Sequence, residues 1–186
     1  NEYSAVESQT APAVADDTSA IMGYFGTRGV VTFSDRVFGK EFIFIQEANS
    51  AWRITPEMGE LKQQLRFGNY VDVGGALSVG RSVQTISPLF VMDLGLHSMP
   101  SPLINPHIPS KSGNLEGKWT ELQGVGRQTN NDGTLAFAGK FGAVSLWIGR
   151  TTAGTLGDLV DAQLRVRGVL MEKLHDTPLL LVPSRR

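Results

Sequence analysis

The chain has no cysteine, little excess charge and no long apolar run. The absence of cysteine excludes disulfides, thiolate metal sites and a cysteine nucleophile. Acidic and basic residues nearly balance, 18 against 17, whereas nucleic-acid-binding proteins usually carry a basic stripe. No run of about 18 apolar residues occurs, so no membrane-spanning helix is predicted. We therefore expect nucleic acid not to be a partner, and any membrane contact to lie outside this sequence.

The sequence also lacks the motifs of a catalytic or metal centre. Its three histidines, at positions 97, 107 and 175, do not have the spacing of zinc ligands. Adjacent carboxylates occur only at Asp16 and Asp17, in a small and polar N-terminal stretch where solvated charges are expected. The Gly-x-Gly within residues 123–127 lacks the third glycine and the helix of a dinucleotide loop. We predict a protein that is not an enzyme and holds no metal or cofactor.

What the sequence does contain is 21 glycines and a series of short alternating segments. In the first half, β-strands are predicted at 28–35, 41–46, 51–55, 69–78 and 86–94, with a short helix at 56–65. In the second half they are predicted at 118–128, 131–139, 143–150, 162–171 and 177–182, with residues 153–160 in the place of the helix. Each half thus has five strands and a connection between the third and the fourth.

The two halves form an internal repeat of roughly 75 residues. Gly29 corresponds to Gly124 and Gly75 to Gly168, at separations of 95 and 93 positions. Five strands in this order are typical of the OB-fold, a small closed Greek-key barrel whose first strand bends sharply at a glycine. An immunoglobulin-like sandwich needs about seven strands in each half. We predict an all-β protein of two consecutive OB-like five-stranded barrels.

The expected organisation has four parts. Residues 1–23 form a flexible lead-in, and residues 24–95 form the first barrel. Residues 96–114 hold four prolines and form a linker, whose Leu103, Ile104 and Ile108 are expected to lie against one or both barrels. Residues 115–186 form the second barrel.

Several motifs resemble a known family. The stretches LRFGNYVDVGGAL (65–77), LEGKWTELQGVGR (115–127) and LLLVPS (179–184) are similar to the tandem OB-like region found outside the membrane in bacterial sensor histidine kinases and diguanylate cyclases. The sequence departs from this pattern over residues 47–65. The resemblance implies an extracytoplasmic, periplasmic input module that is part of a membrane-anchored signalling protein. It implies no particular ligand.

The alternation of residues predicts which side chains face outward. Phe42 and Phe44 align with Leu135 and Phe137, and this bulky set is expected inside the barrels. Ile43 and Ile45 would then point outward. Either the linker, the N-terminal segment or the second barrel covers them, or they form a binding face, because OB barrels commonly bind ligands on strands two and three.

Three tryptophans and two arginines complete the candidate binding residues. Trp119 and Trp147 are expected to face outward, either as ligand anchors or as packing between the barrels. Trp52 is open between core and surface. Arg165 and Arg167 alternate on one strand, where they form either a modest basic patch or an ordinary solvated face.

The leading hypothesis is therefore a non-enzymatic, extracytoplasmic module that binds an unknown small molecule or protein. In such a module, a bound ligand would bias the relative orientation of the barrels. One alternative is a free-standing OB-fold binder of single-stranded nucleic acid or oligosaccharide. Another is a structural or dimerisation spacer, and a homodimer remains open.

Overall fold

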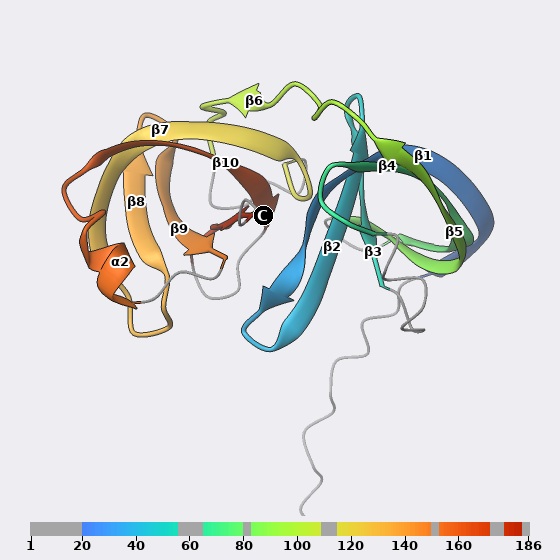
Figure 1. Ribbon diagram of the computed structural model, residues 1–186, viewed down its shortest axis with the longest axis horizontal. Helices are drawn as coiled ribbons and strands as arrows, with labels where there is room; N and C mark the ends of the chain where they lie inside the picture. The colour runs from blue at the N-terminus through green and yellow to red at the C-terminus, as the bar shows by residue number, and fades with distance from the viewer. Residues whose placement is uncertain are drawn as a thin grey trace, which may run out of the picture.

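The computed structural model describes residues 20–55, 65–79, 83–108, 115–149, 153–171 and 177–183. Two barrels lie side by side (Figure 1). The first barrel contains β1 (Ala20–Val37), β2 (Lys40–Glu47), β3 (Ser50–Ile54), β4 (Asn69–Val79) and β5 (Gln84–Leu96). Its strand order is β1-β2-β3-β5-β4, and pairing of β1 with β4 closes the barrel. Among the described strand pairings of this barrel, β3–β5 is parallel and the others are antiparallel, which is the topology of an OB-fold.

The second barrel repeats this topology. It contains β7 (Trp119–Thr129), β8 (Leu135–Gly139), β9 (Gly142–Ile148), β10 (Gln163–Met171) and β11 (Leu179–Val182). The short helix α2 (Ala153–Gly157) lies between β9 and β10. Pairing of β10 with β7 joins the ends of the series, and β9 and β11 are parallel. The predicted fold of two OB-like barrels is confirmed, whereas the helix predicted at 56–65 lies outside the described residues except for Leu65.

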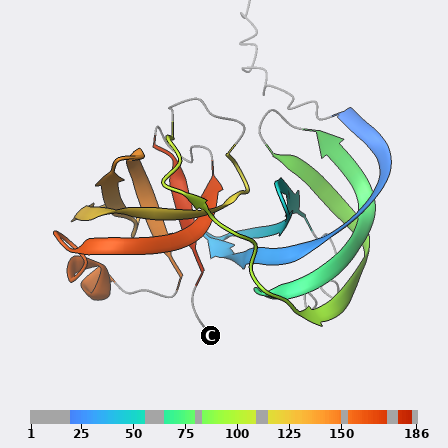
Figure 2. The same cartoon turned by 90° about the horizontal axis from the view of Figure 1, so that it is seen from above.

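The described part of the segment between the barrels crosses from the first barrel to the second (Figure 2). Within it, β6 (Leu103–Ile104) pairs in parallel with the start of β7. Ile108 is buried in the core of the second barrel, as expected, while Ile104 is exposed. At the other end of the chain, β1 begins at Ala20, inside the stretch expected to be a lead-in.

The repeat extends to local detail. The first strand of each barrel has an irregular register at the same place, between Val31 and Phe33 in β1 and between Gly126 and Gln128 in β7. Glycine is required beside a neighbouring strand in both barrels. A Cβ atom at Gly75 would lie 2.1 Å from the carbonyl oxygen of Ser87, and one at Gly168 would lie 2.3 Å from that of Leu181.

The predicted orientation of the second strand is wrong in the first barrel. Val31 pairs with Ile45, whereas the equivalent Gly126 pairs with Phe137. Ile45 therefore corresponds to Phe137, and the alignment that matched Phe44 with Phe137 was displaced by one residue. A displacement of one residue exchanges the two faces of a strand. Ile43 and Ile45 are fully buried inside the first barrel, and they are not surface residues.

The phenylalanines on the other face of β2 join the two barrels. Phe42 and Phe44 pack in one buried cluster with residues of the second barrel. The cluster also contains Phe33, Val37, Val83, Trp119, Val169, Met171, Leu179 and Leu181. Inside the interface, the side-chain Oε1 of Gln46 accepts a hydrogen bond of 2.6 Å from the backbone N–H of Trp119. An apolar interface of this kind holds the two barrels in one arrangement.

Candidate functional site

The outer face of β7 and β10 carries a cluster of three charged side chains. Arg167 lies directly opposite Glu121 in the strand pairing, and Arg165 lies opposite Gln123. The Nε of Arg165 donates to Oε1 of Glu121 at 2.7 Å, and its Nη2 donates to Oε2 at 3.1 Å. The Nε of Arg167 donates to Oε2 of the same carboxylate at 2.7 Å. One carboxylate therefore orients two guanidinium groups.

The two arginines cover the carboxylate and remain accessible themselves. The Glu121 side chain is 1% exposed, while those of Arg165 and Arg167 are 63% and 53% exposed. Hydrogen bonds from Arg165 and Arg167 lower the pKa of Glu121 from 4.5 to about 2, so the carboxylate is charged at neutral pH. The cluster has one net positive charge, and the guanidinium N–H groups that do not reach Glu121 face solvent.

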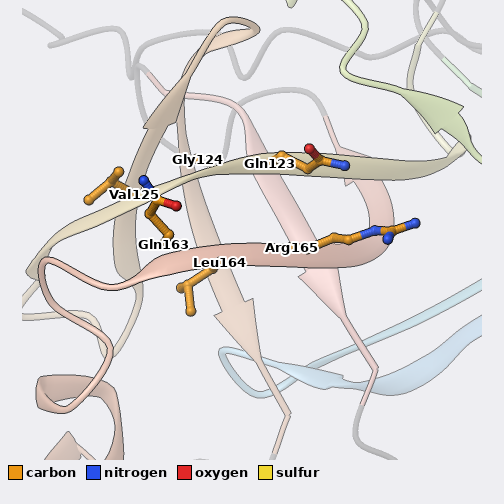
Figure 3. Close-up of a pocket in the computed structure, with 6 residues that line it drawn as sticks. All are labelled: Gln123, Gly124, Val125, Gln163, Leu164 and Arg165. Carbon is orange, nitrogen blue, oxygen red and sulfur yellow. The ribbon is translucent and has the colours of Figure 1, made fainter.

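A surface pocket of about 460 Å³ lies beside this cluster. Figure 3 shows the six residues that line it, Gln123, Gly124, Val125, Gln163, Leu164 and Arg165, all on β7 and β10. Val125 lies at one end of the pocket and Arg165 at the other. The pocket therefore combines two amide side chains with one guanidinium group.

The other candidate residues lie elsewhere. Trp119 is buried between the barrels, and the half-buried Trp147 meets Phe33 edge-on there, with ring centroids 5.7 Å apart. Both tryptophans do point away from the core of the second barrel, and both pack on the first. Trp52 lies in the core of the first barrel, and its indole N–H donates to Gln84. Of the seven candidates, only Arg165 and Arg167 share a solvent-facing surface.

Sequence reasoning missed Glu121, although a signal was present. Glu121 alternates with Leu122, which packs in the core of the second barrel, so Glu121 must face outward with Gln123. Pairing of the first and fourth strands then brings it opposite Arg167. The prediction considered Arg165 and Arg167 without the neighbouring strand β7, and so it did not include the Glu121 carboxylate.

The strand face that OB barrels commonly use is blocked in the first barrel. Strands two and three of that barrel are β2 and β3, and the outward residues of β2 pack against the second barrel. Arg53 of β3 covers the Phe42 ring at 4.7 Å from its centroid.

The part of the chain that the structure describes contains no helix with the length and hydrophobicity that a membrane span requires.

Comparison with known proteins gives similarity to solved structures alone. No family model matches the sequence. No curated protein matches it either. A structure described as the p204 HINb domain is 13% identical, with a TM-score of 0.42, over 90% of this chain and 95% of that chain.

Two other similar structures contain DNA according to their descriptions. One is a murine DNA-binding protein bound with double-stranded DNA, at 10% identity and a TM-score of 0.40, over 84% of this chain and 93% of that chain. The other is the Ifi202 HINa domain in complex with 20-bp double-stranded DNA, at 10% identity and a TM-score of 0.41, over 86% of this chain and 94% of that chain. At these values the ligands belong to those proteins and are not transferred to this chain.

One expectation needs correction. Nucleic acid was expected not to be a partner because the net charge is near zero, whereas these two similar structures contain DNA. Net charge describes the whole surface, whereas binding needs a local group of cations. In the described part of the chain, the Arg165–Glu121–Arg167 cluster on the second OB-like barrel is such a local group.

Proposed function

We propose that the chain is a non-enzymatic OB-fold module that binds single-stranded nucleic acid on the outer face of β7 and β10. The observation that carries this proposal is the pair of exposed arginines that Glu121 holds in fixed positions beside an open pocket. Guanidinium groups bind phosphate through two parallel N–H donors, and orientation before binding reduces the entropy lost on binding.

The composition of this surface defines the expected mode of binding. Many OB-folds stack bases on aromatic side chains, but none of the six residues that line the pocket on β7 and β10 is aromatic. The tryptophans Trp52, Trp119 and Trp147 are engaged in the core of the first barrel and in the interface between the barrels. Phosphate contacts therefore dominate on β7 and β10. We expect weak preference among base sequences and affinity that falls steeply as salt concentration rises.

The test measures binding of a fluorescently labelled oligothymidylate by anisotropy over a series of salt concentrations. Gln163→Glu places a negative charge in the pocket without breaking the Glu121 cluster, and it is expected to weaken binding at least tenfold at low salt. Gln163→Lys is the matched opposite change and is expected to strengthen binding. Absence of binding at low salt, or equal affinity for the two variants, would refute the proposal. A labelled duplex measured in parallel distinguishes single from double strands.

The resemblance of the sequence motifs supports a second proposal, that the module is the extracytoplasmic input region of a bacterial signalling protein. It rests on the stretches at 65–77, 115–127 and 179–184. The test is to read the gene around the coding segment. A membrane-spanning segment together with a kinase or cyclase domain supports this proposal, and a free-standing reading frame contradicts it.

A further inference from the structure

The first barrel exposes an unusual amount of apolar side chain on one face. Five large residues there are between 38% and 73% exposed, namely Tyr24, Leu89, Phe90, Met92 and Leu94. We call this set the β5 face, because four of its members lie on β5. Phe90, Met92 and Leu94 alternate along the strand, while Val91 points into the core. Side chains two residues apart on a strand lie on the same side, so these three form a continuous stripe. Leu96 is not part of the face, because a register shift places it opposite Asn69, on the side of the core residue Val71.

Tyr24 of β1 extends this stripe across the sheet. Gly26 pairs with Gly74, and Gly74 pairs with Phe90, so two glycines separate the aromatic residues of β1 and β5. A Cβ atom at Gly74 would lie 2.2 Å from Cε1 of Phe90 and 2.4 Å from the hydroxyl oxygen of Tyr24. The two rings therefore meet over the glycine, and they remain exposed on their outer sides.

The size of the β5 face matches that of a protein interface. The exposed fractions correspond to several hundred Å² of apolar surface, at or above the roughly 300–600 Å² of the largest patch on a typical monomer. A specific interface takes roughly 800 Å² from each partner. The β5 face would supply the apolar centre of such an interface, and the polar residues around it would supply the rest.

The charges on the β5 face indicate which partner fits. An ion pair lies beside the apolar residues and joins Arg28 of β1 to Asp72 of β4, with 2.8 Å between Nε and Oδ2. Asp72 lies opposite Met92 in the strand pairing. A two-fold axis brings the same surface of a second copy against this face. One cation and one anion side by side are complementary to their own two-fold image, since Arg28 of each copy can approach Asp72 of the other.

We propose that the β5 face is the interface of a two-fold symmetric homodimer. The apolar stripe supplies the buried area, and the Arg28–Asp72 pairs fix the relative orientation of the copies. This surface is separate from the one proposed to bind nucleic acid, and either proposal can fail without the other.

The first experiment is sedimentation velocity of the full chain over a hundredfold range of concentration. The wild type is expected to show a monomer–dimer equilibrium. Met92→Lys and Leu94→Lys are expected to weaken the dimer at least tenfold. Ile104→Lys on β6 is the matched control, because Ile104 is also exposed and apolar but lies outside the β5 face. A monomeric wild type overturns the proposal, and so does a dimer that the Ile104 variant weakens as much as the β5-face variants.

A mixing experiment tests the partner directly. In a dimer of the Arg28→Asp variant, positions 28 and 72 are acidic in both copies and repel across the interface. In a dimer of the Asp72→Arg variant, both positions are basic in both copies, so each variant alone is expected to be monomeric. An equimolar mixture restores attraction across the two-fold axis and is expected to form the heterodimer. Circular dichroism confirms that both variants are folded before mixing. Failure of two folded variants to associate on mixing contradicts the two-fold arrangement.

Discussion

At the scale of single residues, the molecule's most informative side chain is Glu121. The side chains of Arg165 and Arg167 cover its carboxylate and are themselves more than half exposed. Water therefore still screens the attraction between the carboxylate and the two guanidinium groups. Its sequence context is an ordinary alternating strand, and only the pairing of β7 with β10 shows its role. Arg165 and Arg167 can be recognised from the sequence of their own strand, where they alternate with apolar residues.

We expect Glu121 to stabilise the fold in a pH-dependent manner. Its pKa is lowered to about 2 in the folded protein, so its contribution is complete above the unfolded value of about 4.5 and disappears as pH falls from there through 2. Glu121→Gln should lower the free energy of unfolding by about 1 kcal/mol at pH 7, allowing for screening. The difference from wild type in melting temperature should vanish near pH 2. Gln128→Ala, at an exposed and uncharged side chain of the same strand, is the matched control for the effect of substitution itself.

At the scale of elements, the sequence predicts strands well and their faces less well. All ten predicted strands are present, because alternation and glycine-rich turns are local signals. The orientation of β2 was wrong because residues 42–45 are all large and apolar, so alternation is absent there. In β8 the small Ala136 and Ala138 alternate with Leu135 and Phe137, and the same reasoning gave the correct faces. The register of β2 therefore becomes known only from its pairing with β1.

The paired glycines give an element-scale prediction. Gly168→Ala brings a methyl group into the backbone of β11 and should lower the free energy of unfolding by about 1–3 kcal/mol. Gly26→Ala is the control, because a Cβ atom at Gly26 meets nothing within 4 Å. Urea denaturation followed by circular dichroism measures both. Equal losses in the two variants would show that β10 and β11 do not approach as closely as described.

At the scale of the whole molecule, the interface between the barrels is a third core. The sequence indicated that some aromatic residues cover a barrel–barrel contact, and Trp119 and Trp147 do so. It could not indicate Phe42 and Phe44, because that assignment depends on the register of β2. A shared buried cluster also disfavours a mechanism in which ligand binding reorients the barrels. We therefore expect a bound ligand to act by occupying an outer surface of the molecule, without a change in the relative orientation of the barrels.

The interface should therefore contribute to stability as a core does. Phe44→Ala removes a fully buried ring and should cost about 3–5 kcal/mol. Phe38→Ala, at a ring that is 40% exposed on the β1–β2 turn, should cost much less. Thermal unfolding of the wild type should be a single transition reported alike by circular dichroism and tryptophan fluorescence. If Phe44→Ala costs no more than Phe38→Ala, the barrels do not pack through β2.

The contact between the barrels is head to tail, and head-to-tail contacts can in principle continue without limit. The first barrel presents Phe33 paired with Phe44 to its neighbour, and the second barrel has Gln128 paired with Ala136 at the same place. That exchange of two rings for an amide and a methyl group removes the apolar surface on which a further barrel would dock. At this place the second barrel therefore lacks the pair of rings with which the first barrel contacts its neighbour.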